Sequence, residues 1–125
     1  MARKEIRSPN GVSVGPYSHG VDADGFIFVS GQAYMDATTG KLVEGDIQAQ
    51  TAQTFKNLFG VLEAAGLSSD NVQKVNVYLT DINDFKAMNE VYEKQFTKPY
   101  PARTTIGVAS LPMGVRVEIE CIAKR

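Results

Sequence analysis

The alternation of hydrophobic and polar positions along the chain predicts helices and strands in turn. Apolar residues recur at helical spacing from about residue 46 to 65 and again from about 85 to 96, which indicates two amphipathic helices. Apolar residues at every second position, or short continuous apolar runs, are typical of strands. The expected strands cover about residues 17–23, 26–31, 72–80, 103–109 and 115–123.

Residues at the boundaries of these segments agree with the pattern. Asp24-Gly25 separates the first two strands and favours a type I′ turn, which needs positive φ. Asp46 is a suitable N-cap for the first helix, and Pro99 stops the second. The predicted order β-β-α-β-α-β-β fits a two-layer α+β sandwich, and the length of the chain allows one core in a single domain.

Two helices can cover only one face of this sheet, so the other face should be polar. The last strand instead places Glu118, Glu120 and Ile122 together on its less apolar side. In the strand before it, Arg103 shares a face with small residues such as Thr105. Such a mixed face is typical of a ligand cleft or a subunit interface, with a water-wetted face as the alternative.

The amino-acid composition argues against several classes of partner and site. Lys and Arg total 13 and Asp and Glu total 14, and this balance argues against a nucleic-acid partner. One cysteine and one histidine make neither an intrachain disulfide nor a closed zinc site. The charged segment Met1–Asn10 has no apolar stretch, and no apolar run approaches the ~18 residues of a membrane span. We therefore expect a cytoplasmic protein without a membrane segment or a metal.

Arg103 and Glu118 are the strongest candidates for a site. Arginine offers a planar fork of donors to a carboxylate, and glutamate can position a water or pass a proton. If their two strands pair, the side chains can approach each other, with the hydroxyl groups of Tyr17 and Ser30 nearby. A purely structural cross-strand ion pair is the alternative.

Six short motifs, in this order, resemble those of the Rid family of reactive-intermediate (enamine/imine) deaminases, also called L-PSP endoribonucleases. The motifs are Gly15-Pro16-Tyr17-Ser18, Val29-Ser30-Gly31-Gln32, Ala64-Ala65-Gly66-Leu67, Asp81-Ile82-Asn83-Asp84-Phe85, Tyr100-Pro101-Ala102-Arg103 and Val117-Glu118-Ile119-Glu120. The resemblance covers about residues 6 to 124. It implies a chorismate-mutase-like α+β fold with two helices on one face of a mainly antiparallel mixed sheet. It also implies a homotrimer with a central barrel and clefts between subunits.

The resemblance implies roles for individual residues. Arg103 matches the arginine that binds the substrate carboxylate, and Glu118 matches the acidic residue that handles the hydrolytic water or proton. The residues that match the lining of the cleft are Tyr17, Ser30, Gly31 and Asn89.

Two positions depart from the usual family residues. Thr105, a further substrate-binding candidate, stands where many members have cysteine. The change is harmless if the position acts through its backbone carbonyl, and it shifts substrate preference if the position acts through its side chain. His19 stands where glutamine is more usual, and we expect a surface or interface hydrogen bond there rather than catalysis. Glu120 lies two residues from Glu118 on the same face, so it can raise the pKa of Glu118 or pair with a nearby base.

The implied activity is that of a 2-iminobutanoate/2-iminopropanoate deaminase, a cofactor-free hydrolase of C=N bonds that converts 2-aminoacrylate-type intermediates into 2-oxo acids and ammonia. Two alternatives stay open. A non-catalytic regulator that binds small carboxylates such as 2-oxo acids would use Arg103 equally well. An endoribonuclease agrees with the other family name, but the chain lacks a basic stripe.

Overall fold

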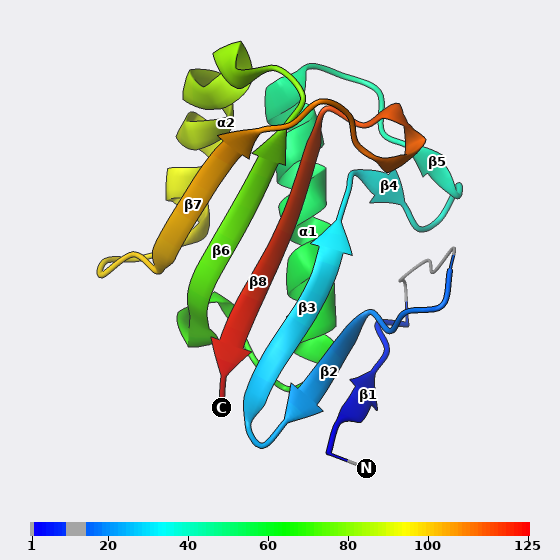
Figure 1. The fold of residues 1–125 in the computed structure, drawn as a ribbon, viewed down its shortest axis with the longest axis vertical. Coiled ribbons are helices and arrows are strands. Elements are labelled where there is room, and N and C mark those ends of the chain that lie inside the picture. Colours follow the sequence, from blue (N-terminus) through cyan, green and yellow to red (C-terminus); the bar gives the residue numbers. More distant parts are fainter. Residues whose placement is uncertain (1, 10–14) are drawn as a thin grey trace.

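Both helices lie on the same face of one sheet, as Figure 1 shows. The computed structural model describes residues 2–9 and 15–125, so the two ends of the charged segment Met1–Asn10 lie outside the described residues. Six of the described strands form the sheet in the order β1-β2-β3-β8-β6-β7. Their bounds are β1 Lys4–Ile6, β2 Gly20–Ala23, β3 Phe26–Gln32, β6 Val72–Leu79, β7 Ala102–Gly107 and β8 Val117–Lys124.

Neighbouring strands of this sheet are antiparallel except β6 and β7, which are parallel. The mainly antiparallel mixed sheet with two helices on one face confirms the predicted architecture. Two parts of it were not predicted: strand β1, and a ribbon of β4 (Met35–Asp36) with β5 (Lys41–Leu42). These strands have only two or three residues, which is too short for an alternating pattern to stand out.

The turn between β2 and β3 has the predicted chemistry. Asp24 and Gly25 both adopt positive φ, at 61° and 87°, as a type I′ turn requires. Strand β2 begins at Gly20 rather than at residue 17. His19, just before β2, still lies beside β3, because the Ser30 backbone N–H donates a hydrogen bond of 2.9 Å to the His19 carbonyl.

Helix α1 spans Ile47–Ala64 and begins as the sequence predicts. The Asp46 side chain accepts a hydrogen bond of 2.9 Å from the Ala49 backbone N–H. Two buried threonines face the core, and the Thr51 hydroxyl donates to the Ile47 carbonyl at 2.7 Å. The Thr54 hydroxyl likewise donates to the Gln50 carbonyl at 2.8 Å, so both threonine hydroxyls are satisfied within the helix and this face can pack against the sheet.

Helix α2 spans Phe85–Tyr92, shorter than the predicted helix to residue 96, and a 3-10 turn at Glu93–Gln95 follows it. The apolar stripe nevertheless continues past the helix, because Phe96 is buried together with Met88 and Tyr92. Tyr92 and Phe96 pack with Phe55 and Phe59 of α1, with ring centroids 5.2 to 5.9 Å apart. This aromatic cluster fixes α2 against α1.

The order of the strands overturns one expectation about the site. Strands β7 and β8 do not pair with each other, because β6 lies between them. Arg103 is opposite Val75, which is fully buried under the helices, whereas Glu118 is opposite Tyr78 on the other face. Paired residues share a face of a sheet, so Arg103 lies on the helix face and Glu118 on the open face. The predicted approach of these two side chains within one chain is wrong.

Candidate functional site

Arg103 extends from the edge strand β7 onto helix α2. Its guanidinium carbon is 4.5 Å from the centroid of the Tyr92 ring and 5.4 Å from that of Phe85. Its Nη1 donates a hydrogen bond of 2.6 Å to Oδ1 of Asn89. All three partners belong to α2, so this helix determines the direction of the guanidinium.

The guanidinium of Arg103 keeps donors available for a ligand. Of its five N–H groups, only one on Nη1 is engaged by a side chain among residues 2–9 and 15–125. A guanidinium that stacks on an aromatic ring still presents its edge to a partner in the plane of the fork. The arrangement therefore suits a carboxylate, which such an edge binds through two parallel hydrogen bonds.

Two buried hydroxyl groups lie near this arginine. Thr105 shares the helix face of β7 with Arg103, and its Oγ1 is buried without a hydrogen-bond partner in the described part of the chain. The Tyr92 hydroxyl is also buried without a hydrogen-bond partner among the described residues. Burial raises the pKa of Tyr92 to about 12, although the charge of Arg103 acts in the opposite direction. Tyr92 therefore stays protonated, and its ring serves as a neutral surface under the guanidinium.

Glu118 lies against a β-bulge on the open face of the sheet. The pairing of β3 with β8 shifts register between Val29 and Gln32. A Cβ atom on Gly31 would lie only 2.5 Å from Oε2 of Glu118, so the carboxylate rests directly on the backbone of this glycine. Among the residues that the structure describes, the Glu118 side chain has no hydrogen bond or ion pair, so its oxygens are free for a ligand or a water.

The carboxyl group of Glu118 has a raised pKa. Burial is the larger cause, and the charge of Glu120, two residues along β8, is the other. Glu120 is itself held by Tyr78, whose hydroxyl donates to Oε1, and by Asn76, whose Nδ2 donates to the same oxygen at 3.2 Å. The hydrogen bond to Glu120 raises the pKa of Tyr78 to about 12. Glu120 thus contributes to the raised pKa of Glu118 and pairs with no base among the described residues.

Ser30 and Tyr17 lie beside this glutamate. The Ser30 hydroxyl donates to the Ser18 carbonyl at 2.6 Å and so holds the segment that carries Tyr17 against β3. The Tyr17 side chain is 45% exposed. With Gly31, Glu118 and further residues, both line a cavity of about 790 Å³.

The structure therefore divides the predicted site residues into two groups. One group lines the cavity and consists of Tyr17, Ser30, Gly31 and Glu118. The other surrounds the guanidinium on the helix face and consists of Asn89, Arg103 and Thr105. Within one chain the two groups lie on opposite faces of the sheet, so neither is a complete site for a small substrate.

The residues that support Arg103 and Glu118 were not identified as such from the sequence. Phe85 and Tyr92 belong to the helical apolar spacing of residues 85 to 96, and a residue that packs on a guanidinium has the same spacing as a core residue. The alternation along residues 72–80 puts Tyr78 on the face opposite Val75 and Val77, but nothing in the sequence indicates that it bonds to Glu120.

Two further residues that could carry chemistry, His19 and Cys121, are buried in the fold. His19 makes the kind of hydrogen bond that was expected, since its Nδ1 accepts from the Ser8 backbone N–H at 3.0 Å, but it is buried rather than at the surface. Cys121 is a buried free cysteine. Within residues 2–9 and 15–125, no group of three or more His, Cys, Asp and Glu side chains could hold a metal ion. In the same part of the chain, no helix has both the length and the apolar character of a membrane span.

Comparison with known proteins assigns the chain to a family. The family model described as Endoribonuclease L-PSP matches residues 8–125. A RutC family protein of Aquifex aeolicus is 49% identical over 123 residues, covering 96% of this chain and 98% of the relative. A protein of Homo sapiens named 2-iminobutanoate/2-iminopropanoate deaminase is 45% identical over 111 residues, covering 89% and 81%.

A solved structure supports the same assignment. The Rid family protein YyfA of Yersinia pestis, described as a protein of unknown function, superposes with a TM-score of 0.95 at 39% identity. The superposition covers 99% of this chain and 100% of that protein. The chain therefore belongs to the L-PSP endoribonuclease family, also known as the Rid family.

Proposed function

We propose that the protein is a cofactor-free deaminase that hydrolyses 2-aminoacrylate-type enamines and imines to 2-oxo acids and ammonia. The observation that carries this proposal is the state of Arg103, which α2 holds with the edge of its fork free for a small carboxylate. The names of several relatives, among them the human 2-iminobutanoate/2-iminopropanoate deaminase, support it. We place the activity in the cytoplasm, because the one cysteine needs no oxidising compartment.

In this mechanism Arg103 binds the substrate carboxylate and so fixes the adjacent α-carbon. Glu118 is the proton carrier, and its raised pKa favours the protonated form that this role requires at the start. It donates a proton to the terminal carbon of the enamine, which becomes an iminium ion. The carboxylate that remains then accepts a proton from the water that attacks the α-carbon.

The products follow from the balance of atoms. Glu118 passes the proton it took from the water to the nitrogen of the tetrahedral intermediate, so the C–N bond breaks and ammonia leaves. As the α-carbon becomes the carbonyl of the 2-oxo acid, its hydroxyl proton returns to Glu118, which is again protonated. One enamine and one water thus give one 2-oxo acid and one ammonia. Imine hydrolysis is already fast in water. The enzyme therefore needs only to position the substrate carboxylate, one water and one proton carrier to make the reaction faster still.

The functional unit that we propose is a homotrimer. Arg103 and Glu118 lie on opposite faces of one sheet, so a site that uses both takes them from two chains. The open face also exposes Phe26, Phe28 and Ile106 at 42%, 44% and 45%, and large apolar patches mark protein interfaces. In this assembly the open faces form a central barrel, the helices lie outside, and a cleft lies at each of the three interfaces.

The test is the rate of 2-oxo acid and ammonia formation from 2-aminoacrylate that a lyase generates in the assay. We expect the wild type to exceed spontaneous hydrolysis and Arg103→Ala to lose about a hundredfold in kcat/KM, as truncation of one partner of a charged pair does. Glu118→Gln is expected to lose activity because the amide carries no transferable proton. The matched controls are the exposed Arg7→Ala and Glu93→Gln, which should behave as the wild type.

Other outcomes would favour the alternatives. A wild type that binds a 2-oxo acid through Arg103 but leaves the rate of ammonia release unchanged would be a carboxylate-binding regulator. Cleavage of RNA that persists in repeated preparations and disappears in Arg103→Ala would favour the endoribonuclease. Either result would contradict the proposed deaminase.

A further inference from the structure

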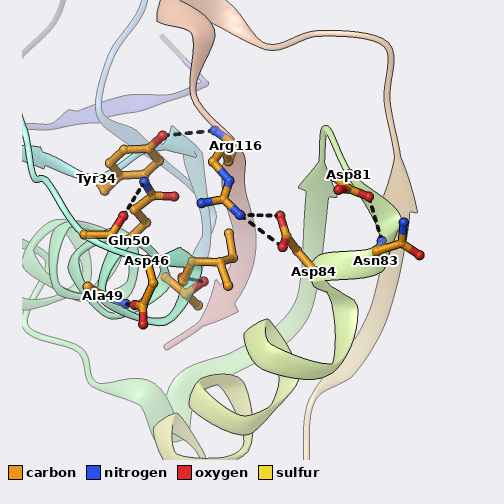
Figure 2. Close-up of polar contacts among 11 residues, drawn as sticks. Tyr34, Asp46, Ala49, Gln50, Asp81, Asn83, Asp84 and Arg116 are labelled. Carbon is orange, nitrogen blue, oxygen red and sulfur yellow. Dashed lines mark hydrogen bonds and ion pairs between the residues drawn. The ribbon is translucent and has the colours of Figure 1, made fainter.

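An ion pair joins the beginning of β8 to the segment that precedes α2. Nη2 of Arg116 donates to both carboxylate oxygens of Asp84, at 3.1 Å and 2.9 Å. Figure 2 shows the guanidinium extending from the β8 side toward this aspartate. The Asp84 side chain is only 15% exposed, so the pair is partly shielded from solvent.

The main chain at Arg116 is fixed independently of its side chain. Its backbone N–H donates to the buried hydroxyl of Tyr34 at 3.0 Å, which Figure 2 also shows. Its carbonyl accepts a hydrogen bond of 3.1 Å from the Thr80 backbone N–H, at the end of β6. The guanidinium therefore starts from a point that the sheet and Tyr34 hold in place, and Asp84 is the partner that it restrains.

Asp84 occupies the N-cap position of α2, where an aspartate usually accepts a hydrogen bond from a backbone N–H of the first turn. Its side chain makes no such bond here. Both oxygens instead bind Arg116. The capping interaction is thus replaced by a connection between the helix and the sheet.

Further contacts hold α2 from Ala87 onward. Nε2 of Gln48 on α1 donates to the Ala87 carbonyl at 3.3 Å and to Oε2 of Glu90 at 2.8 Å. Met88 and Tyr92 are buried in the core. The first residue of α2 has neither kind of support, and the Phe85 side chain is 37% exposed. The ion pair with Arg116 is therefore the polar contact nearest to the start of this helix.

We propose that the Asp84–Arg116 ion pair positions the first turns of α2 so that Phe85 and Asn89 hold Arg103 in its ligand-binding direction. Asp84 and Arg116 are positioning residues in this account, because they act on the substrate only through α2. The inference rests on the proposed function in one respect, namely that Arg103 binds the substrate carboxylate.

The kinetic test compares Asp84→Ala and Arg116→Ala with the wild type. We expect KM for the enamine substrate to rise about tenfold in both variants, because a small displacement of a binding group weakens binding. The dissociation constant of a 2-oxo acid should rise with it, while kcat changes little, since Glu118 stays in place. The double variant should match either single variant, because both remove one shared interaction.

A matched control exists at the opposite end of the sheet. Arg125 pairs with Asp22 at 2.8 Å, with side-chain exposures of 46% and 18% against 43% and 15% for Arg116 and Asp84. Arg125→Ala should lower thermal stability to a similar extent without changing KM. Equal changes of KM in Arg125→Ala and Arg116→Ala would overturn the proposal, because they would indicate a general loss of stability.

The sign of the Asp84→Ala effect separates positioning from simple charge attraction. If Arg116 acted on the substrate carboxylate only through its long-range charge, removal of the negative Asp84 would lower KM. Positioning requires that Asp84→Ala raises KM as Arg116→Ala does. A lowered KM in Asp84→Ala would therefore contradict the proposal.

Hydrogen exchange gives a readout that does not depend on the deaminase activity. Faster exchange of the backbone amides in residues 85–92 is expected in Asp84→Ala and Arg116→Ala, and not in Arg125→Ala. If the wild type neither turns over 2-aminoacrylate nor binds 2-oxo acids, the proposed function fails and this experiment still decides the structural role. Unchanged exchange in residues 85–92 would overturn the positioning role even in an active enzyme.

Discussion

Glu118 is a carboxylate whose surroundings disfavour its charge. Burial and the neighbouring Glu120 both raise its pKa, and no described side chain donates a hydrogen bond to it. When the folded-state pKa of an acid lies above its unfolded value, the ionised group lowers the stability of the fold. This cost is absent below the ordinary glutamate pKa of 4.5 and appears in full once the pH exceeds the raised pKa.

We therefore expect Glu118→Gln to stabilise the protein in a pH-dependent manner. Its Tm should exceed that of the wild type at about pH 8, and the difference should disappear at about pH 4, where the wild-type carboxyl is protonated. Thermal unfolding of both proteins across this range measures the difference. The exposed Glu93→Gln should show no such trend, and a Glu118→Gln variant less stable than the wild type at about pH 8 would contradict the expectation.

Thr105, on the helix face of β7, also carries a group whose burial lowers the stability of the fold. Its Oγ1 is buried without a partner in the described residues, and an unsatisfied buried hydroxyl costs free energy. Thr105→Val keeps the shape of the side chain and should raise the free energy of unfolding by about 1 kcal/mol. Urea unfolding measures this change. Activity should be retained if the position acts through its backbone carbonyl, and a loss of activity would assign the hydroxyl a role in substrate binding.

At the scale of elements, the bulge in β3 creates the place where Glu118 lies. The shift of register brings the backbone of Gly31 directly under the carboxylate, an approach that any side chain would block. The motif Val29-Ser30-Gly31-Gln32 thus has a physical reason for its glycine.

The substitution Gly31→Ala tests whether Glu118 needs this close approach to the backbone of residue 31. The new Cβ would meet Oε2 of Glu118 at 2.5 Å and its Cδ at 2.9 Å, so the carboxylate must turn away from the bulge. Because the end of a flexible side chain can move, we expect Tm to change little while kcat falls at least about tenfold, as for a displaced catalytic group. An unchanged kcat would show that Glu118 need not rest on the bulge to work.

Elements with strong local signals were predicted correctly, and those with weak signals were not. The Asp24-Gly25 turn and the Asp46 cap depend on residues that are neighbours in sequence, so the sequence alone identifies them. Helix α2 was predicted too long, because the apolar spacing of Met88, Tyr92 and Phe96 continues through the 3-10 turn. Periodicity reports which face is buried, and it does not report where the hydrogen-bond pattern changes.

At the scale of the whole molecule, the position of β6 between β7 and β8 separates Arg103 from Glu118. Each residue has partners that prepare it for a ligand: α2 for the arginine, and the bulge with Glu120 for the glutamate. Two half-sites on opposite faces are the reason for proposing that each complete site comes from two chains.

Subunit complementation tests this arrangement. Arg103→Ala and Glu118→Gln should each be inactive alone. When equal amounts are unfolded and refolded together, about a quarter of the sites in a closed ring combine an intact arginine with an intact glutamate. The mixture should therefore recover about a quarter of the wild-type activity. A mixture as inactive as its components, although mixed oligomers form, would contradict a shared site.

The sequence by itself determined the two helices, most of the strands, the turn chemistry and the residue types of the site, because these depend on short-range periodicity and on motifs a few residues long. Only the tertiary structure decided that Arg103 and Glu118 lie on opposite faces, since strand order is set by long-range pairing that local patterns do not encode. It also decided which side chains support each of them, because Tyr92 and Tyr78 approach their partners from other parts of the chain.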